Sequence, residues 1–354
     1  MKVAVVGVGL IGGSVGLAAR EQLGAEVVGW DPAPDALRAA VARGALDRAA
    51  PDVAEALAGA EVAFVAAPVG ALPAAVRAVL DAAGDDCAVT DVGSTKRAVV
   101  EATTDPRFIG GHPLAGAAAA GVQHARADLF QGATWYLTPT ARSRGTLYER
   151  LHRLLTQLGA RPAAIDAATH DRLLATVSHL PHVLANVLVA QAAQALGEES
   201  VPATGPSFRD VTRVAGSNTA IWRDIYLANA DALIAAIDDA TARLAVVRAD
   251  LAGADGDAVA RWNDAARDDR RRLLEADLAG GEVHELRVSV PNRPGVVAEV
   301  ALALGRCGVN ISDMALYPAP DRSSGYIVLW IAGAERAAQA ETLVAELGLP
   351  VARA

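Results

Sequence analysis

The chain has 354 residues, of which 52% are hydrophobic and 21% are charged, and its formal net charge is −9. This length predicts two or three domains with a substantial core, and the acidic balance argues against nucleic acid as a partner, because phosphate recognition needs an excess of cations. No uninterrupted apolar stretch reaches the about 18 residues that span a bilayer, so we expect a cytoplasmic protein with no membrane partner.

The first predicted element is a strand followed by a glycine-rich turn and a helix. The apolar run Val3–Val6 leads into the turn Gly7–Gly12 and a helical pattern, and a second apolar run, Glu26–Trp30, ends at Asp31. This order is typical of a dinucleotide-binding βαβ unit. A secretory signal peptide can begin in a similar way, but the glycines between positions 7 and 16 would make a poor apolar helix, and another strand follows.

Each residue type in this unit has a mechanical reason. Gly7 permits the tight turn, Gly9 lets the backbone approach a pyrophosphate at the helix N-terminus, and Gly12 lets the helix pack closely on the strand. A carboxylate at Asp31 would accept hydrogen bonds from the adenine ribose and repel a 2′-phosphate, which favours NAD over NADP. We therefore predict that NAD is the cofactor and that it is bound by Gly7, Gly9, Leu10, Ile11, Gly12, Asp31, Pro68 and Asp91.

Strands alternate with helices through the rest of the first domain. Helical patterns cover Pro34–Arg43 and Leu72–Ala83, and a short edge strand is expected near Ala45. This alternation predicts a Rossmann-type parallel sheet, in which ligands bind at the carboxyl ends of the strands. Polar or glycine-rich motifs at residues 68–70, 91–96 and 111–116 follow three such ends, and two later runs, Ala133–Pro139 and Arg161–Asp166, are expected to close the sheet.

Residues 167–280 change character and carry apolar residues at helical spacing. They predict an all-helical second domain whose long helices form the core of a homodimer. Gly280 and Gly281 provide a hinge, after which residues 281–354 follow the order of a βαββαβ module. The expected architecture is therefore α/β, with a Rossmann-type domain over residues 1–166, a helical domain over 167–280 and a ferredoxin-like module over 281–354.

A dehydrogenase needs a base that takes the hydroxyl proton as hydride leaves the same carbon, and histidine is the usual choice. Among the seven histidines, His112 follows a strand end in a Gly-Gly-His-Pro turn, and Ser94 at the preceding strand end could orient it or the substrate hydroxyl. Taken alone, His112 could equally be a turn histidine with a structural role. The histidines without polar neighbours are interpreted as structural or exposed: His124, His152, His170 and His284.

His179 and His182 lie three residues apart and hence on one helix face. Metal binding is one interpretation, but no third ligand of suitable type lies nearby in the sequence, so no metal is expected. Cys87 and Cys307 also lack metal-ligand spacing and are expected to be buried thiols instead of a disulfide. An arginine that faces a cleft would clamp a carboxylate, and Arg213 is the candidate.

The motifs taken together resemble the prephenate dehydrogenase family. The glycine turn with Asp31 is followed, in the family's order, by the segments 91–94, 111–116, 178–182, 208–213 and 222–224, and the similarity covers residues 1 to about 280. The tail resembles an ACT domain, a small-molecule-sensing module that is often appended to amino-acid biosynthetic enzymes. The resemblance implies that this module holds its ligand at Asn292, Arg293, Pro294 and Gly295, with Asn310 on the next strand.

The resemblance also implies a reaction and a role for each site residue. Prephenate would lose hydride to NAD⁺ and lose carbon dioxide, giving 4-hydroxyphenylpyruvate for tyrosine biosynthesis. His112 would accept the hydroxyl proton, Ser94 would orient His112 or the hydroxyl, and Arg213 would bind a substrate carboxylate. The residues that line the substrate pocket would be His179, His182 and Trp222. Tyrosine is the implied effector of the ACT module.

One segment departs from the family's pattern. Relatives carry polar, charged residues after the His-Pro-Leu-Ala-Gly motif, whereas this chain has Ala117–Ala120. The catalytic set is intact, so activity is expected, but the choice between prephenate and its amino analogue arogenate stays open, as does the mode of feedback control. The sequence is also compatible with a non-catalytic NAD-binding regulatory protein. A β-hydroxyacid dehydrogenase would use a lysine of the helical domain, and the lack of any lysine after Lys96 disfavours that class.

Overall fold

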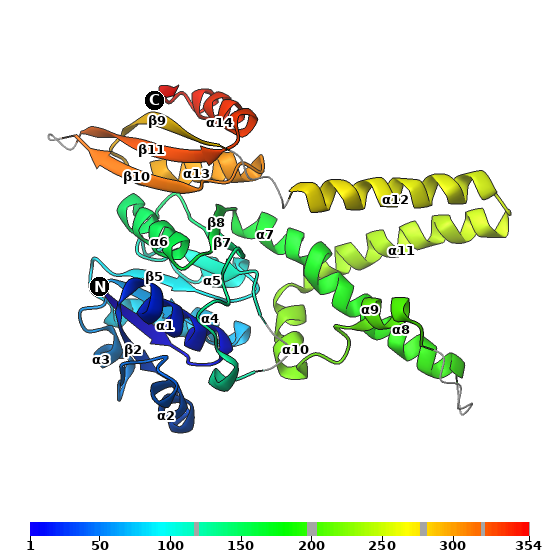
Figure 1. Ribbon diagram of the computed structural model, residues 1–354, viewed down its shortest axis with the longest axis horizontal. Helices are drawn as coiled ribbons and strands as arrows, with labels where there is room; N and C mark the ends of the chain where they lie inside the picture. The colour runs from blue at the N-terminus through cyan, green and yellow to red at the C-terminus, as the bar shows by residue number, and fades with distance from the viewer. Residues whose placement is uncertain (117–119, 197–203, 277–281, 320–322, 354) are drawn as a thin grey trace. The chain divides into compact units, whose positions relative to one another are not determined.

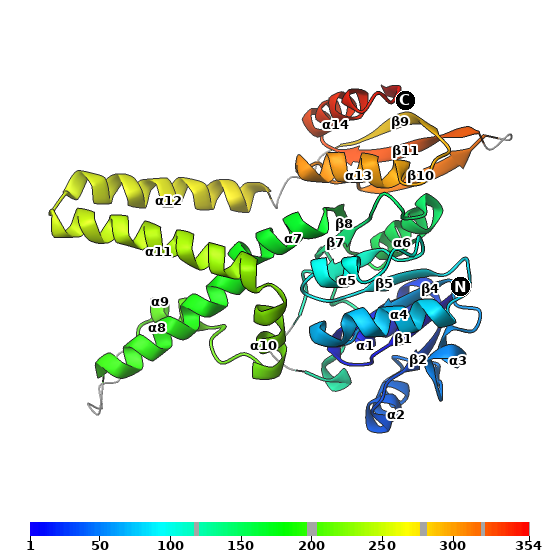
Figure 2. The same cartoon turned by 180° about the vertical axis from the view of Figure 1, so that it is seen from behind.

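The computed structural model describes residues 1–116, 120–196, 204–276, 282–319 and 323–353. The chain forms two compact units, one of Met1–His170 with Glu282–Ala354 and the other of Asp171–Gly281. Figures 1 and 2 show the elements of both units from opposite sides. The first unit joins the N-terminal sheet domain to the C-terminal module, although these segments stand at opposite ends of the chain.

A five-stranded parallel sheet lies at the centre of the N-terminal domain, in the order β3-β2-β1-β4-β5. Alternate residues of β1 point into different cores: Val3 and Val5 pack with helix α1, whereas Ala4 and Val6 pack with α3 and α4. Helices therefore cover both faces of the sheet, which confirms the predicted Rossmann-type architecture. The elements are β1 Lys2–Val6, α1 Leu10–Leu23, β2 Glu26–Trp30, α2 Pro34–Ala42, β3 Arg48–Ala49, α3 Val53–Leu57, β4 Val62–Val65, the 3₁₀ helix η1 Val69–Ala71, α4 Leu72–Ala82, β5 Ala88–Asp91 and α5 Arg97–Glu101.

The strands after β5 do not extend this parallel sheet, contrary to the expectation. Strands β6 (Gly110–Pro113), β7 (Thr134–Thr138) and β8 (Arg161–Ala164) form a separate sheet in that order, and an isolated bridge between Val89 and Phe108 links it to β5. Strand β6 runs antiparallel to β7. In the described part of their connection, the 3₁₀ helix η2 (Val122–His124) is the one helical element, so no long helix carries the chain back for parallel pairing.

The C-terminal module has the predicted βαββαβ order, and its sheet is antiparallel in the order β10-β11-β9-β12. It shares one hydrophobic core with helix α6 (Gly145–Gln157), since Leu151 of α6 and Val300 of α13 belong to the same buried cluster. A Cβ at Gly305 of α13 would overlap the Ala164 carbonyl oxygen of β8, so this close approach requires glycine. The elements are β9 Val283–Pro291, α13 Val296–Arg306, β10 Asp313–Pro318, β11 Ser324–Ala332, α14 Ala334–Glu346 and β12 Val351–Arg353.

The second unit is helical throughout its described residues, as predicted. Helix α7 (Ala167–Leu174) leads through a π-helical turn, η3 (Ala175–His179), into α8 (Leu180–Leu196). Pro181 at the start of α8 has no N–H to donate and would crowd the preceding turn of a regular helix, and the wider π turn accommodates it. The remaining helices are α9 Pro206–Thr212, α10 Thr219–Ala228, α11 Ala230–Ala252 and α12 Gly256–Ala276.

Large apolar side chains lie exposed on the helices of this unit. Leu227, Leu244, Trp262 and Leu273 are each more than half exposed, and the exposure of several large apolar side chains on neighbouring helices of the sequence is typical of an interaction surface. The helix over Ala167–Ala195 is long and apolar enough to cross a membrane by length and composition, which the sequence interpretation did not anticipate. The same composition also suits a helix that packs against a second copy of the chain.

The two cysteines differ in their environments. Cys87 is buried before β5, and this burial raises the pKa of its thiol to about 11. Cys307 is exposed, contrary to the expectation that both thiols would be buried. It follows the last residue of α13, beyond the buried face of the helix that ends with Leu304.

Candidate functional site

The glycine turn between β1 and α1 has the geometry needed to hold a phosphate group. Gly7 has a φ of 94°, and a Cβ there would lie 2.5 Å from a carbonyl oxygen just after β4. A Cβ at Gly12 would overlap the Gly7 carbonyl oxygen, so strand and helix approach too closely for a side chain. At Gly9, the N-cap of α1, no atom lies within 4 Å of an added Cβ. This open space lies at the N-terminal amides of α1, including those of Leu10 and Ile11, and it suits an anion.

Asp31 closes the turn from the end of β2. Its Oδ2 accepts a hydrogen bond from the Val8 amide at 2.9 Å, and its Oδ1 accepts one from the Ala33 amide at 2.8 Å. These bonds hold a partly exposed carboxylate beside the glycine turn, where a ribose would follow a bound pyrophosphate. Pro68 is exposed after β4, at the start of η1. Both residues follow strands of the parallel sheet, and their contacts with a nucleotide stay a prediction.

Asp91, which was also predicted to contact the cofactor, is completely buried at the end of β5 and forms an ion pair with the equally buried Lys96. Its carboxylate accepts hydrogen bonds from the Gly93 amide at 2.8 Å and from the Gly111 amide at 3.1 Å. The Lys96 ammonium donates to the Gly111 carbonyl oxygen at 2.7 Å. The buried ion pair therefore fastens β6 and the turn that carries the half-buried Ser94 to the end of β5. Because the Asp91 carboxylate faces protein donors, its position supports a structural role instead of a cofactor contact.

His112 lies on β6, opposite Tyr136 of β7, and is almost completely buried. Its Nδ1 lies 2.9 Å from Nε2 of His170. The two imidazole rings meet edge-on with their centroids 5.1 Å apart, and the His170 ring meets Tyr136 edge-on at 5.6 Å. Because this contact engages Nδ1, a proton transfer to His112 would use Nε2. The sequence interpretation took His170 as structural or exposed; it is completely buried and contacts the candidate base His112.

A second cluster of predicted residues lies in the helical unit. The rings of His179 and His182 both contact Trp222 of α10, His179 edge-on at a centroid distance of 6.1 Å and His182 stacked at 3.5 Å. Nδ1 of His182 lies 3.0 Å from the Ser178 carbonyl oxygen. Burial lowers the pKa of His182, and the charge of Arg213 lowers it further. His182 is therefore neutral near neutral pH, and the exposed Arg213 lies within electrostatic reach of it.

Asn229 belongs to the same cluster, although no sequence motif marked it. It is completely buried, and its Nδ2 donates to the Asp171 carbonyl oxygen at 2.7 Å and lies 3.2 Å from Nδ1 of His179. Since the amide is a donor, the His179 Nδ1 accepts, which fixes the tautomer of that ring. Lys96, which pairs with Asp91, was also not predicted as part of the site. Its rarity was the available signal, because the chain has only two lysines.

The predicted effector residues Asn292–Gly295 connect β9 to α13 and border a cavity of about 400 Å³. Gly295 has a φ of 83°, so the turn requires glycine there. The Arg293 guanidinium forms an ion pair with Glu299. Asn310, which was expected on the next strand, lies exposed in the loop before β10 and does not line the cavity, so this part of the prediction is corrected.

Further expectations concern a metal site and two segments that lie wholly or partly outside the described residues. Within the described ranges, no group of three or more His, Cys, Asp or Glu side chains could hold a metal ion. The departure at Ala117–Ala120 falls largely on residues 117–119, which lie outside the described residues, as does the hinge at Gly280 and Gly281.

The glycine turn, the acid that ends β2 and a histidine oriented beside β5 define a dinucleotide-dependent dehydrogenase. Residues 15–163 match the nucleotide-binding domain of prephenate dehydrogenase, and residues 166–264 match its dimerization domain. Residues 286–348 match the ACT domain of the AHAS small subunit-like type. The chain belongs to the prephenate dehydrogenase family.

Similarity to individual proteins extends over most of the chain. The prephenate dehydrogenase of Bacillus subtilis (strain 168) is 30% identical over 334 residues, which covers 91% of this chain and 89% of that protein. The prephenate dehydrogenase of A. aeolicus, solved in complex with hydroxyphenyl propionate and NAD⁺, is 26% identical with a TM-score of 0.71 and covers 77% of this chain and 98% of its own. The arogenate dehydrogenase of Synechocystis is 29% identical with a TM-score of 0.69 and covers 77% of this chain and 100% of its own.

Family membership accounts for two features of the molecule. The chain is an NAD-dependent oxidoreductase, which agrees with the glycine turn and Asp31. The exposed apolar side chains of α10, α11 and α12 lie within or next to the residues that match the dimerization domain, so a partner subunit accounts for them better than a membrane does.

Proposed function

We propose that this chain catalyses the NAD⁺-dependent oxidative decarboxylation of prephenate to 4-hydroxyphenylpyruvate, as a cytoplasmic homodimer. The observation that carries the proposal is the 2.9 Å contact between His112 and His170, which supports His112 as an oriented base. The chain also fits the cofactor, because the space beside Gly9 that a Cβ would occupy lies at the helix N-terminus and is open to a pyrophosphate.

The protein's own residues would handle the proton. When bound, NAD⁺ supplies the hydride acceptor for the carbon that bears the hydroxyl, while loss of carbon dioxide makes the ring aromatic. His112 accepts the hydroxyl proton at Nε2, which requires that Nδ1 carries a hydrogen and donates to Nε2 of His170. This hydrogen bond strengthens when His112 becomes an imidazolium, because its donor is then charged. His170 thus acts as a positioning residue, and the proposal keeps Ser94 as a residue that orients His112 or the substrate hydroxyl.

The helical unit carries the residues that the family resemblance assigns to substrate binding. We propose that Arg213 holds a carboxylate of prephenate, since its guanidinium is exposed and prephenate carries two carboxylates. His182 and Trp222 offer a stacked pair of flat rings, and His179 is held rigidly by Asn229. Because burial and Arg213 keep His182 neutral, this wall of the proposed pocket adds no second charge beside the arginine.

Arogenate is the second candidate substrate. It differs from prephenate in carrying an amino group in place of the side-chain keto oxygen. Both compounds have the same ring hydroxyl and ring carboxylate, so the same base would act on both. The arogenate dehydrogenase of Synechocystis has a similar fold over the whole of its length, which favours testing this substrate alongside prephenate.

We further propose that tyrosine, the amino acid made from the product, regulates the enzyme through the C-terminal module. The support is the match of residues 286–348 to an ACT domain and the cavity beside Asn292–Gly295.

The test is NADH or NADPH formation with prephenate and with arogenate, each against NAD⁺ and NADP⁺. We expect turnover with prephenate and NAD⁺, and preference for arogenate would support the second candidate. His112→Asn should lower kcat by about 10²–10⁴-fold while NAD⁺ binding stays nearly unchanged. If no substrate and cofactor pair is turned over although NAD⁺ binds, the chain is a non-catalytic nucleotide-binding protein and the proposal is wrong.

A further inference from the structure

A cavity of about 400 Å³ lies between the C-terminal module and the N-terminal domain. The module contributes its loop Asn292–Gly295 together with residues of β9, β10, β11 and the start of α13. The N-terminal domain contributes Pro106 and the segment from Arg142 to Thr146 at the start of α6. The volume falls in the range of small-molecule sites, which is about 300–1,000 Å³.

The two domains meet at the edge of this cavity through a pair of glycines. A Cβ at Gly295 would overlap the Ala141 carbonyl oxygen, and a Cβ at Gly145 would lie 2.6 Å from Val297. Each glycine therefore lets one domain approach the other where a side chain would hold them apart. The cavity is consequently a composite site of both domains and is not contained in the ACT module alone.

The walls of the cavity are mostly apolar, and aromatic rings lie at one side. Val290, Val296 and Leu316 line it, and the rings of Tyr317 and Tyr326 stack with their centroids 4.8 Å apart. Such a surface favours a ligand with an apolar or aromatic body, because its burial removes apolar area from water.

Three arginines line the cavity, and their partners differ. Arg144 donates to the Asp85 carbonyl oxygen at 2.7 Å, and Arg293 pairs with Glu299. The Arg142 guanidinium has no hydrogen-bond or ion-pair partner among the described residues, and it is exposed at the cavity. A planar guanidinium without such partners can donate two parallel hydrogen bonds to a carboxylate.

We propose that this composite cavity binds an amino acid, or its keto-acid analogue, with an apolar or aromatic side chain, and that Arg142 of the N-terminal domain holds its carboxylate. The proposal rests on the regulatory role proposed above for the C-terminal module, but it does not depend on the catalytic activity. It places the carboxylate-binding residue outside the module, so the ligand bridges the two domains.

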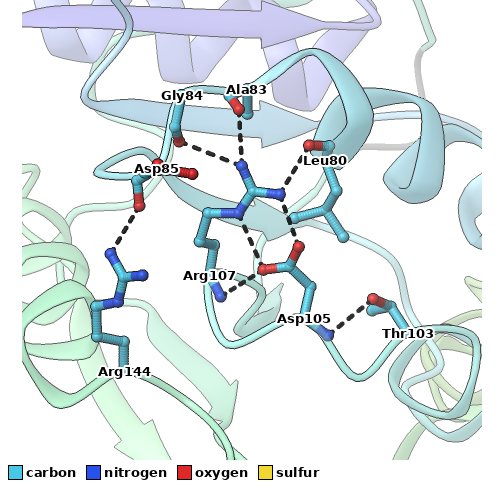
Figure 3. A network of polar contacts seen from close by, with 8 residues as sticks. All are labelled: Leu80, Ala83, Gly84, Asp85, Thr103, Asp105, Arg107 and Arg144. Carbon is cyan, nitrogen blue, oxygen red and sulfur yellow. Dashed lines mark hydrogen bonds and ion pairs between the residues drawn. The ribbon is translucent and has the colours of Figure 1, made fainter.

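The cavity is connected through the chain to the candidate base. Pro106 lines the cavity and lies on the segment that becomes β6, and its carbonyl oxygen accepts a hydrogen bond from the Arg144 amide at 2.8 Å. The neighbouring Arg107 fixes this segment: as Figure 3 shows, it donates to the Leu80 carbonyl oxygen at 2.8 Å and pairs with Asp105.

The second wall leads to the same pair of strands. The segment that contains Arg142 follows β7, and Tyr136 of β7 lies opposite His112 of β6. A ligand held by Arg142 and the module therefore contacts one segment that enters the His112 strand and another that leaves its partner strand. Binding in the cavity is thus expected to change the activity as well as the stability of the enzyme.

The test measures binding directly on the full chain by isothermal titration calorimetry without substrate, using L-tyrosine, L-phenylalanine and L-valine as separate probes. We expect at least one to bind, and Arg142→Ala to raise its Kd about tenfold or more, the effect of losing a hydrogen-bonded charge. Thr146→Trp, at an exposed lining position, should fill the cavity and abolish binding. Arg336→Ala, at an arginine of α14 away from the cavity, is the matched control and should leave Kd unchanged.

Three results would overturn the inference: no binding of any probe, wild-type Kd values in both cavity variants, or inhibition that competes with prephenate and is unaffected by Arg142→Ala. These outcomes are separate from failure of the catalytic proposal, which appears as absent NADH formation whether or not a probe binds. Where a probe inhibits, the half-inhibiting concentration should rise in Arg142→Ala by the same factor as Kd.

Discussion

Replacing Lys96 with methionine would leave the Asp91 carboxylate completely buried without its counter-ion. Asp91 would keep the amides of Gly93 and Gly111, but the ammonium that pairs with it and donates to the Gly111 carbonyl oxygen would be gone. Removing one partner of a buried ion pair costs about 3–5 kcal/mol. A typical protein has a total stability of only about 5–15 kcal/mol, so the loss is large.

For a unit of this size, each kcal/mol lowers Tm by about 2–4 °C, so Lys96→Met should lower it by roughly 6–20 °C. The assay is thermal unfolding followed by circular dichroism. Asp91→Asn combined with Lys96→Met removes both charges and should recover much of the loss. Lys2→Met replaces the other lysine, which lies at the surface, and should change stability by less than about 0.5 kcal/mol. A Lys96→Met protein as stable as the wild type would refute the view that this ion pair fastens β6 to β5.

The remaining predictions concern the two histidine environments and the substrate arginine. His170→Ala should lower kcat about tenfold to a hundredfold and shift its pH profile, since a charge-assisted hydrogen bond to His112 is lost; His170→Gln should restore part of the rate, and an unchanged profile in His170→Ala would exclude the positioning role. Arg213→Ala should raise KM for prephenate with little change in kcat, with Arg223→Ala as the control, and an unchanged KM would move the carboxylate site elsewhere. Burial lowers the pKa of His152 from 6.5 to about 4, so between these values the unfolded chain binds a proton that the folded chain does not. Stability should therefore fall by about 3 kcal/mol as pH falls through this range, and denaturant unfolding should show a smaller fall in His152→Gln.

The first half of the fold was predictable because its signals are local. Apolar runs that end at Gly7 and Asp31 specify a strand, a turn and a second strand within one short segment, and Gly7 and Gly12 of the turn each meet a steric limit that the structure shows. The strands around His112 were harder, because their antiparallel pairing depends on how the chain returns between them. No local pattern predicts that the described part of this connection contains only the short helix η2. The βαββαβ order of the tail was predictable from periodicity, but its packing on α6 was not, since the contact at Gly305 joins residues far apart in the sequence.

The candidate site divides in the same way. Residues within motifs, such as His112 and Trp222, could be predicted as site residues because their sequence neighbours are themselves distinctive. His170, Lys96 and Asn229 escaped because each acts through partners that lie at a distance in the sequence, and a polar residue looks the same in the sequence whether it faces solvent or another side chain. Asp91 is a related case, since its place at a strand end suggests a ligand contact, whereas the burial of its side chain becomes visible only in three dimensions.

The N-terminal domain and the C-terminal module belong to one compact unit, and this affects how the protein folds during translation. The N-terminal domain leaves the ribosome first, but the face formed by α6 and β8 finds its partner only when α13 and the last strands have been synthesised. Until then, the apolar side chains of that face are open to solvent while the whole helical unit is still being translated. The nascent chain therefore exposes an aggregation-prone apolar surface through most of its synthesis. The yield of folded protein should depend on chaperones more strongly than that of a relative without the C-terminal module.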